Sequence, residues 1–389
     1  MTQKQLGPDN AGAYFQDFAV AGREMNESIR SAINEEMGDG ARRRPRTWGA
    51  KETHEMIGRS VGWLHDNDPD VPRNDANHGR WTLARINTLR EKAGTLYRRP
   101  PGSSPLIMSA SKLKGGVGNS TFCCHFAHYL AMQSLRVLVW DLDPQGTATS
   151  VLGALVPDAH LDEEDLPNMA LLDDLSLFPG CVRKTYFHNV HLVPANSALQ
   201  DLDMQLSQQN ASGEEFAIPP YERASRALDL VKDNYDVIII DCPPALGFLT
   251  LNALMASTAL INPVRPSLLD LASYIMFTGS LQLFYQEVAN KPLKYHRVLI
   301  NMNRGTAGNS REENRIRALY GDSVLISTIR HSEEIANAAS MMNTVYGLEK
   351  SIGGRETHKR ALDYLNAAFS EILTEFKAIW EMEGEEYEQ

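Results

Sequence analysis

Residues 114–121, KGGVGNST, lie between a short apolar run, Leu106–Ser109, and a segment that favours a helix, Ser120–Ser134. Glycine has no Cβ, so this loop can turn several backbone N–H groups inward around one anion. The following helix would add its free N-terminal amides and the positive end of its dipole. A hydroxyl at Ser120 is placed to bind Mg²⁺. The stretch therefore predicts a strand, a phosphate-binding loop and a helix, with an ordinary glycine-rich turn as the alternative.

Two further strands are predicted to end in carboxylates. Residues 137–146 read VLVWDLDPQG, and residues 237–244 read VIIIDCPP. The carboxyl ends of parallel strands face the ligand crevice of such a sheet, so Asp141, Asp143 and Asp241 would gather beside the loop. A single acid after a strand is as readily a solvated cap. The glycine loop and two acidic strand ends, three strand ends in one sheet, favour a site for a nucleoside triphosphate.

Strands and helices are expected to alternate after residue 104. Apolar runs predict strands, and the intervening segments predict helices. This order is typical of a parallel sheet with helices on both faces. The predicted strands are Leu106–Ser109, Val137–Trp140, Val237–Ile240, Ala259–Pro263 and Val298–Asn301, and the predicted later helices include Tyr221–Asp233 and Leu268–Glu287.

Composition excludes several classes of protein. The chain has 389 residues, 43% of them hydrophobic, which excludes wholesale disorder and suits two or three domains. No apolar run is long enough for a membrane span, and the start lacks the pattern of a secretion signal. The four cysteines form neither a disulfide framework nor a spaced zinc site, so we expect a reducing cytoplasm.

Charge is distributed unevenly along the chain. The 38 Lys+Arg and 49 Asp+Glu give a net charge of −11, which at first argues against nucleic-acid binding. Residues 42–99, however, carry thirteen basic and seven acidic side chains, about +6, which leaves about −17 for the rest. The glutamates of residues 381–388 belong to that acidic remainder, and we expect them to form a frayed tail. A basic module thus precedes an acidic body.

The basic segment has the pattern of a helix-turn-helix. Residues 47–64 predict two helices around a glycine turn, with a small core from Ala50, Met56, Ile57, Val61 and Leu64. Ser60 would cap the second helix, Asp68–Arg80 suit a wing hairpin, and Thr82 would cap a third helix. The side chains expected to meet DNA are Arg59, Ser60 and Trp63 in the major groove, with Arg73 and Arg80 on phosphates. The alternative is a basic helical domain that only spaces a dimer.

Residues before this segment predict one more helix. Apolar residues recur along residues 11–37, and glycines at 38 and 40 end the pattern. A helix of this length is not stable alone, so it must pack either on its own body or on a second copy. We assign residues 1–40 to dimerisation, 41–99 to the winged module and 100–389 to the α/β part.

Together, the motifs carry a family resemblance. Residues 114–120 (KGGVGNS), 141–146 (DLDPQG) and 240–244 (IDCPP) resemble the deviant Walker ATPases of the ParA/MinD type. Residues 182–199 and 236–251 look like the plasmid-partition branch, most similar to the ParA homologues of repABC plasmids. The basic module resembles the winged helix of MerR-like regulators, which partition relatives also carry. The resemblance implies a Rossmann-like parallel-sheet P-loop ATPase behind a helical, winged helix-turn-helix region.

The resemblance also implies roles for individual residues. It implies ATP or ADP as the nucleotide, with Mg²⁺ bound directly by Ser120 and through water by Asp241, and with Asp141 supporting the metal and the loop. Asp143 would position the attacking water, and Lys114 would reach the phosphates of a second copy in an ATP-sandwich homodimer. The nucleotide contacts it implies are Lys114, Gly115, Gly116, Val117, Gly118, Asn119, Ser120, Thr121, Asn301 and Met302.

One motif residue departs from the family. The family has a second lysine at the position of Asn119, which would be catalytic through its contact with the β- and γ-phosphates. Asparagine keeps amide donors but has no positive charge, and neutral phosphate contacts are about half as strong as charged ones. We therefore expect hydrolysis to be weak or abolished. Either the residue is an engineered trapping substitution, which we favour, or the enzyme binds ATP and scarcely hydrolyses it.

The resemblance finally implies partners and a cellular role. It implies partition of a replicon, a ParB-type centromere-binding partner, autorepression through operator DNA, and a cytoplasmic, nucleoid-associated location without membrane attachment. Nonspecific DNA would be held by Arg315, Arg317, Lys350 and Arg355. Two alternatives stay open: a nucleotide-responsive transcriptional repressor that moves no cargo, and a positioning ATPase for a protein cargo.

Overall fold

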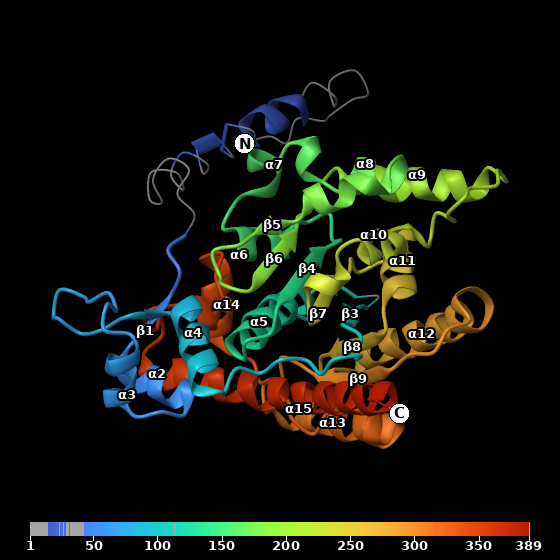
Figure 1. Ribbon diagram of the computed structural model, residues 1–389. Helices are drawn as coiled ribbons and strands as arrows, with labels where there is room; N and C mark the ends of the chain where they lie inside the picture. Colours follow the sequence, from blue (N-terminus) through green and yellow to red (C-terminus); the bar gives the residue numbers. More distant parts are fainter. Residues whose placement is uncertain are drawn as a thin grey trace, which may run out of the picture.

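The computed structural model describes residues 15–22, 24–25, 27–28, 31, 43–112 and 114–388 (Figure 1). Residues 15–22 are helical, as the pattern over 11–37 predicts. Residues 24–25, 27–28 and 31 are helical as well, and most of the segment assigned to dimerisation lies outside the described residues.

A seven-stranded sheet forms the centre of the molecule, in the order β5-β6-β4-β7-β3-β8-β9. All neighbours are parallel except β5, which pairs antiparallel to β6. The five strands predicted from the sequence are confirmed, whereas β5 and β6, the last two strands at one end of the sheet, were not expected. The strands are β3 (Leu106–Ala110), β4 (Val137–Asp141), β5 (Arg183–Lys184), β6 (Val190–Val193), β7 (Val237–Asp241), β8 (Ala259–Val264) and β9 (Tyr295–Ile300).

Alternate residues of the inner strands enter different cores. Val137 and Val139 of β4 join one hydrophobic cluster, and Leu138 and Trp140 join another. Successive side chains of a strand point to opposite faces, so both faces of the sheet are covered. Figure 1 shows α5 and α15 on one side and α10 and α11 on the other.

The helices that cover the sheet follow the predicted alternation, with shorter bounds. The helix expected over Tyr221–Asp233 is α10 followed by a short 3₁₀ turn, and the one over Leu268–Glu287 is α12 followed by a π turn. The helices are α5 (Asn119–Met132), α6 (Thr147–Gly153), α7 (Pro157–His160), α8 (Asn168–Leu172), α9 (Leu199–Ala211), α10 (Arg223–Asp229), α11 (Phe248–Ala256), α12 (Leu268–Phe284), α13 (Ala307–Tyr320), α14 (Glu333–Ser340) and α15 (Arg355–Glu388). Among the helices of the described residues, none has both the length and the apolar content needed to cross a membrane.

The expectation of a frayed acidic tail is wrong, because α15 continues to Glu388. Ile372, Phe376 and Trp380 recur every four residues and are buried, which holds the last turns against the sheet. The indole of Trp380 donates to the Ser104 carbonyl (3.0 Å), and Glu383 accepts from the Ser104 amide (2.9 Å). Glu381, Glu385 and Glu386 are exposed on this packed helix, whereas Glu383 faces Ser104.

The amino-terminal module has the predicted helices and glycine turn. Residues 68–80, predicted as a wing hairpin and called the wing below, contain an antiparallel bridge between Arg73 and Gly79. The module comprises β1 (Thr47–Trp48), α2 (Ala50–Ile57), α3 (Val61–Asn67), β2 (Trp81–Thr82) and α4 (Leu83–Ala93). Ser60 caps α3 by accepting from the Trp63 amide (3.2 Å), and Thr82 caps α4. Val61, expected in the small core, is 39% exposed at the first position of α3.

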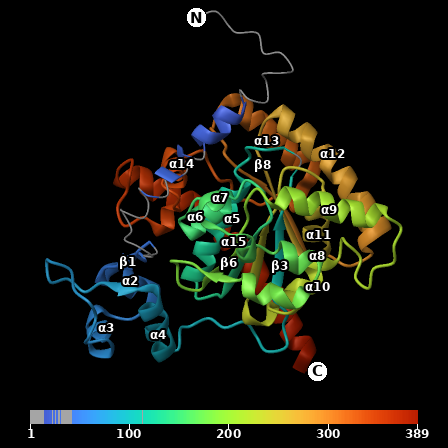
Figure 2. The ribbon, with the colours of Figure 1, turned by 90° about the horizontal axis from the view of Figure 1, so that it is seen from above.

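The module shares one hydrophobic core with the α/β body, which we define as residues 100–388. Trp48 packs edge-on against Phe187 of the body, with ring centroids 6.4 Å apart. Arg90 of α4 donates to the Met132 carbonyl (2.7 Å) at the end of α5. Figure 2 shows the module (blue) at one side of the body.

Candidate nucleotide-binding site

The loop between β3 and α5 has a backbone that exposes amides. Gly116 and Gly118 have φ of +78° and +81°, where a side chain would be strained. A Cβ on Gly118 would also lie 3.0 Å from Asn301 Nδ2. Among the described residues, no side chain caps the amino end of α5. The first N–H groups of this 14-residue helix are therefore free for an anion.

Asp241, at the end of β7, has one carboxylate oxygen without a partner. It is fully buried, and its Oδ1 accepts from Asn119 Nδ2 (2.9 Å). Its Oδ2 is buried with no hydrogen-bond partner in the described part of the chain. Burial raises the pKa of Asp241 to about 6, and a hydrogen bond from Ser120 opposes that rise. A hydroxyl and an orphaned carboxylate oxygen side by side are suitable ligands for Mg²⁺ or its water.

Asp141 and Asp143 lie on the neighbouring strand end and have different surroundings. Both oxygens of Asp141 are satisfied, by the Thr149 amide and hydroxyl (2.8 Å each) and by the Asp143 amide (3.1 Å). Burial and the nearby Asp241 raise the pKa of Asp141 well above its usual range. Asp143 is half-buried and accepts from the Gln145 amide (3.0 Å). Asp141 thus holds the loop after β4, and Asp143 is the more accessible carboxylate.

The described residues form no metal site from protein side chains alone. Within the described ranges, no three His, Cys, Asp or Glu side chains are grouped so that they could hold a metal ion. Mg²⁺ usually takes one or two protein ligands, with waters and substrate phosphates completing its shell. Ser120 and Asp241 are the protein groups that suit this mode.

Asn119 joins two strand ends. It is 2% exposed, and its Nδ2 donates to the Ala110 carbonyl (2.7 Å) as well as to Asp241. Its Oδ1 is buried and unpartnered among the described residues. The side chain therefore links β3 to β7 as a neutral group, where the family has a lysine.

Lys114 is paired within its own chain. Its Nζ lies 3.3 Å from Asp270 Oδ1, in the first turn of α12, and its side chain is 35% exposed. Arg265 also lies 3.4 Å from the same carboxylate oxygen. Asp270 is 4% exposed and is therefore held by two cations. Lys114 would have to leave this partner before it could contact another chain.

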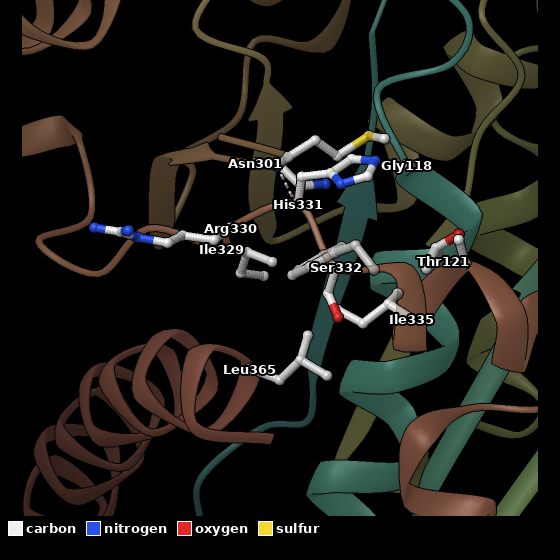
Figure 3. A pocket seen from close by; sticks show the side chains of 12 residues that line it. Gly118, Thr121, Asn301, Ile329, Arg330, His331, Ser332, Ile335 and Leu365 are labelled. Atoms are coloured by element: carbon white, nitrogen blue, oxygen red, sulfur yellow. Dashed lines mark hydrogen bonds between the residues drawn. The ribbon is translucent and has the colours of Figure 1, made fainter. Parts of the chain in front are cut away.

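A cavity of about 130 Å³ opens beside the loop (Figure 3). Asn301 and Met302, predicted from the sequence, line it next to Gly118, and Asn301 Nδ2 donates to the Val117 carbonyl (2.8 Å). The far walls come from segments that sequence reasoning missed, because the approach of residues 329–336 and α15 to this loop has no local signal. Those additional lining residues are Phe122, Ile329, Arg330, His331, Ser332, Ile335, Ala336 and Leu365. The mostly apolar walls suit a flat ring such as a nucleobase.

The DNA-contact candidates on the module are mostly engaged in internal contacts. Arg59 donates to the Ala93 carbonyl (2.7 Å), and Arg73 donates to the Asn77 carbonyl (3.0 Å) within the wing. Arg80 donates to the Thr47 hydroxyl (3.0 Å) and carbonyl (2.7 Å). Trp63 is half-buried against the core. Of the five candidates, Arg59 and Ser60 are exposed at the start of α3, and Arg73 is exposed in the wing.

The candidates on the body are not gathered on one element. Arg315 and Arg317 lie on α13, and Arg355 is the first residue of α15. Arg317 binds Glu313 (2.9 Å) and the Leu325 carbonyl (2.9 Å), which makes it a brace for the fold. Arg315 pairs with Glu312 (3.0 Å), whereas Lys350 and Arg355 are exposed.

The chain is similar to several known proteins. A family model described as "AAA domain" matches residues 106–295. A putative replication protein A of Sinorhizobium fredii (strain NBRC 101917 / NGR234) is 32% identical over 292 residues, which are 72% of this chain and 70% of that protein. The sporulation initiation inhibitor protein Soj of Bacillus subtilis (strain 168) is 35% identical over 196 residues, 50% of this chain and 72% of Soj.

The chain is also similar to a solved structure that contains a bound nucleotide. The cobyrinic acid a,c-diamide synthase from Mycobacterium smegmatis, with bound ADP and magnesium, is 26% identical with a TM-score of 0.52. The match covers 61% of this chain and 91% of that one. The expected P-loop α/β fold with a mostly parallel sheet is confirmed. The chain belongs to the family of ParA/Soj/SopA-like partition ATPases and replication protein A homologues.

Proposed function

We propose that this chain is an ATP-dependent partition protein whose ATP-bound form pairs two copies and holds nonspecific DNA. One observation supports it most: the Asp241 carboxylate, which has one orphaned oxygen among the described residues, lies close to Ser120, next to a glycine loop and an uncapped helix end. These are the groups that Mg²⁺ and a triphosphate require. The solved relative that holds ADP and magnesium supports the same assignment.

Each group in the site has a proposed task. Amides of the loop and of α5 bind the phosphates, and the cavity beside Asn301 receives the adenine. Ser120 and Asp241 hold Mg²⁺, which when bound neutralises charge on the phosphates. Asp143 orients the attacking water, while Asp141 fixes the loop through Thr149. Phosphoryl transfer needs mainly this positioning and charge neutralisation.

Dimerisation in this proposal begins with the ion pair of Lys114. Lys114 exchanges Asp270 for the phosphates of the second copy, so bound ATP becomes part of the interface. Breaking this ion pair costs little free energy, because Lys114 is 35% exposed and Arg265 still neutralises the buried Asp270 after Lys114 leaves. Asn119 makes turnover slow, since no lysine at this position contacts the phosphates of its own chain as charge develops. A ParB-type partner would then stimulate release.

The amino-terminal module gives the protein its second proposed activity. We propose that it binds operator DNA and represses the protein's own operon. The common core of the module and the body favours a nucleotide-responsive repressor as the second candidate function, because a change at α5 reaches α4 through Arg90. A positioning ATPase for a protein cargo explains the module less well. The proposed location is the cytoplasm, on the nucleoid.

The test is DNA binding by the full chain with Mg·ATP, Mg·ADP or no nucleotide. Random-sequence and upstream operator DNA are compared at several salt concentrations, because phosphate contacts weaken as salt rises. Partition predicts that random DNA is bound only with ATP, and that this binding is highly salt-sensitive. Operator binding with ADP and no ATP-dependent binding of random DNA would select the repressor. Equal binding in all states would contradict the switch.

A further inference from the structure

Lys112 lies at the carboxyl end of β3, two residues beyond the strand. The strand's last residue, Ala110, is in register with Asp241 of β7. The intervening Ser111 is fully buried, and its carbonyl accepts from Asn262 Nδ2 (2.8 Å) of β8. The backbone that carries Lys112 is therefore fixed between two neighbouring strands. Its side chain is half-buried and lines a small cavity together with Lys114, Val117 and Asp270.

The ammonium of Lys112 is close to the acidic strand ends but pairs with none of them. Asp241 and Asp143 are the carboxylates that interact with it electrostatically. With the residues that the structure describes, Lys112 makes no hydrogen bond and no ion pair within 4.0 Å. Burial lowers the pKa of Lys112, and Asp241 opposes that change. A half-buried cation without a partner is costly, which points to an anion that is bound in the working state.

The other two motif positions do not supply a free cation from the same chain. Asn119 is neutral and is used to join β3 to β7. Lys114 is held by Asp270 and, under the proposed function, serves the second copy. Lys112 is thus the lysine next to Asp241 that has no partner among the described residues. It lines a cavity together with Lys114 and Val117 of the glycine loop, and it interacts electrostatically with Asp241.

We propose that Lys112 supplies the positive charge toward the triphosphate that Asn119 lacks, an inference that rests on the proposed nucleotide site. The positive charge then lies at Lys112, after the end of β3, instead of at position 119 in the first turn of α5. Coulomb attraction tolerates such a displacement, because it falls slowly with distance in a poorly hydrated site. A hydrogen bond that must be aligned with the transition state is lost when the charge is displaced in this way. Lys112 therefore restores ATP binding more than ATP hydrolysis.

The competing explanation is that Lys112 only neutralises Asp241 and Asp143 in the folded chain. The two roles differ in what the Lys112→Met variant loses. If the lysine contacts the phosphates, its removal weakens the binding of ATP more than that of ADP, because the γ-phosphate adds negative charge. If the lysine is purely structural, its removal lowers the melting temperature of the ligand-free chain and weakens the binding of ATP and ADP equally.

The experiment is calorimetric titration of Mg·ATPγS and Mg·ADP into the full chain, with the ligand-free melting temperature measured for each variant. Lys112→Met is compared with Lys112→Arg, which keeps the charge. Lys377→Met is the matched control. Lys377 lies on α15 and is also partly desolvated, but its ammonium lies over the ring of Tyr97. The double variant Lys112→Met/Asn119→Lys asks whether a lysine at the family's position replaces Lys112.

We expect Lys112→Met to weaken ATPγS binding roughly 10- to 100-fold, the loss of one charge-assisted contact, and ADP binding less. Lys112→Arg, the control and the double variant should bind ATPγS within about threefold of the parent chain. Unchanged ATPγS affinity in Lys112→Met would overturn this inference alone. So would equal losses for both nucleotides with a lowered melting temperature. Failure of the parent chain to bind either nucleotide would overturn the proposed function, and this inference with it.

Discussion

Arg90 joins the amino-terminal module to the helix that follows the glycine loop. It is 6% exposed, and its guanidinium donates to Ser134 Oγ (2.8 Å) and to the carbonyls of Met132 (2.7 Å) and Met56 (3.1 Å). Because α5 runs from Asn119 to Met132, this contact is a direct mechanical link between the two parts. The variant Arg90→Met fills similar space and removes every donor.

The expected effect on stability follows from these contacts. Three buried or partly buried acceptors lose this donor, at about 2 kcal/mol each, whereas Asn87 Oδ1, which also accepts from Arg90, keeps the hydrogen bond from Ser134. The variant also avoids burying a guanidinium, whose pKa burial lowers from 12.5 to about 10, and this returns roughly 3 kcal/mol. We therefore expect the free energy of unfolding to fall by about 3 kcal/mol, with a melting temperature lower by roughly 5 °C.

Hydrogen exchange measured by mass spectrometry locates the loss. In Arg90→Met, amides of α2 and α4 should exchange faster, while those of β4 and β7 keep their protection. Arg85→Met is the matched control, since Arg85 lies on the same helix but pairs with Asp68 at the surface. Exchange in α2 and α4 that matches the parent chain and the control would refute the claim that Arg90 couples the module to α5.

Three further predictions concern the site and α5. Asn119→Lys should raise the basal ATPase rate about tenfold or more, because it restores a charged phosphate contact. Asp270→Asn should strengthen ATP-dependent self-association about two- to fivefold in sedimentation, since Lys114 loses its competing partner. His125 should make the fold acid-sensitive: its Nδ1 lies 2.7 Å from the Thr121 carbonyl, its Nε2 accepts from the Val345 amide (3.1 Å), and burial lowers its pKa to about 4.

The sign of the pH effect is fixed by the direction of that shift. A histidine whose pKa is lower in the folded chain stabilises the fold fully above pH 6.5, and this stabilisation is lost as pH falls toward 4. The loss is about 3 kcal/mol, measured by urea unfolding at each pH. His125→Gln should flatten this dependence, and His78→Gln, on the exposed wing, should not. Identical pH profiles for parent and His125→Gln would contradict the assignment.

Two outcomes would contradict the other predictions. An unchanged ATPase rate in Asn119→Lys would mean that the missing lysine does not limit turnover. Unchanged or weaker ATP-dependent association in Asp270→Asn would mean that the Lys114 ion pair does not oppose pairing.

Local patterns in the sequence predict much of this fold. The strand–loop–helix around residues 114–121, the acidic strand ends and the caps Ser60 and Thr82 are all read from neighbouring residues, and each has the expected conformation. Such features depend on backbone preference and on hydrogen bonds that span three or four residues. For this reason these features can be predicted without knowledge of the tertiary structure.

Contacts between distant segments could not be predicted in the same way. The pair Lys114–Asp270, the Arg90 link and the cavity wall at residues 329–336 join parts of the chain with no shared local pattern. The charge of residues 381–388 favours a frayed tail, but the buried apolar side chains of α15 that end at Trp380 decide the conformation of this segment. Lys112 was passed over for a similar reason, since only the pairing of β3 with β7 brings it to Asp241.

The central claim is that the loop between β3 and α5 binds Mg·ATP. Calorimetric titration of the full chain and of Gly118→Val tests it most directly. Valine at φ +81° is strained, and its Cβ would lie 3.0 Å from Asn301 Nδ2. We predict one nucleotide per parent chain and no measurable binding by the variant, with both proteins folded by circular dichroism. Absence of binding by the parent chain, or equal binding by Gly118→Val, would contradict the claim.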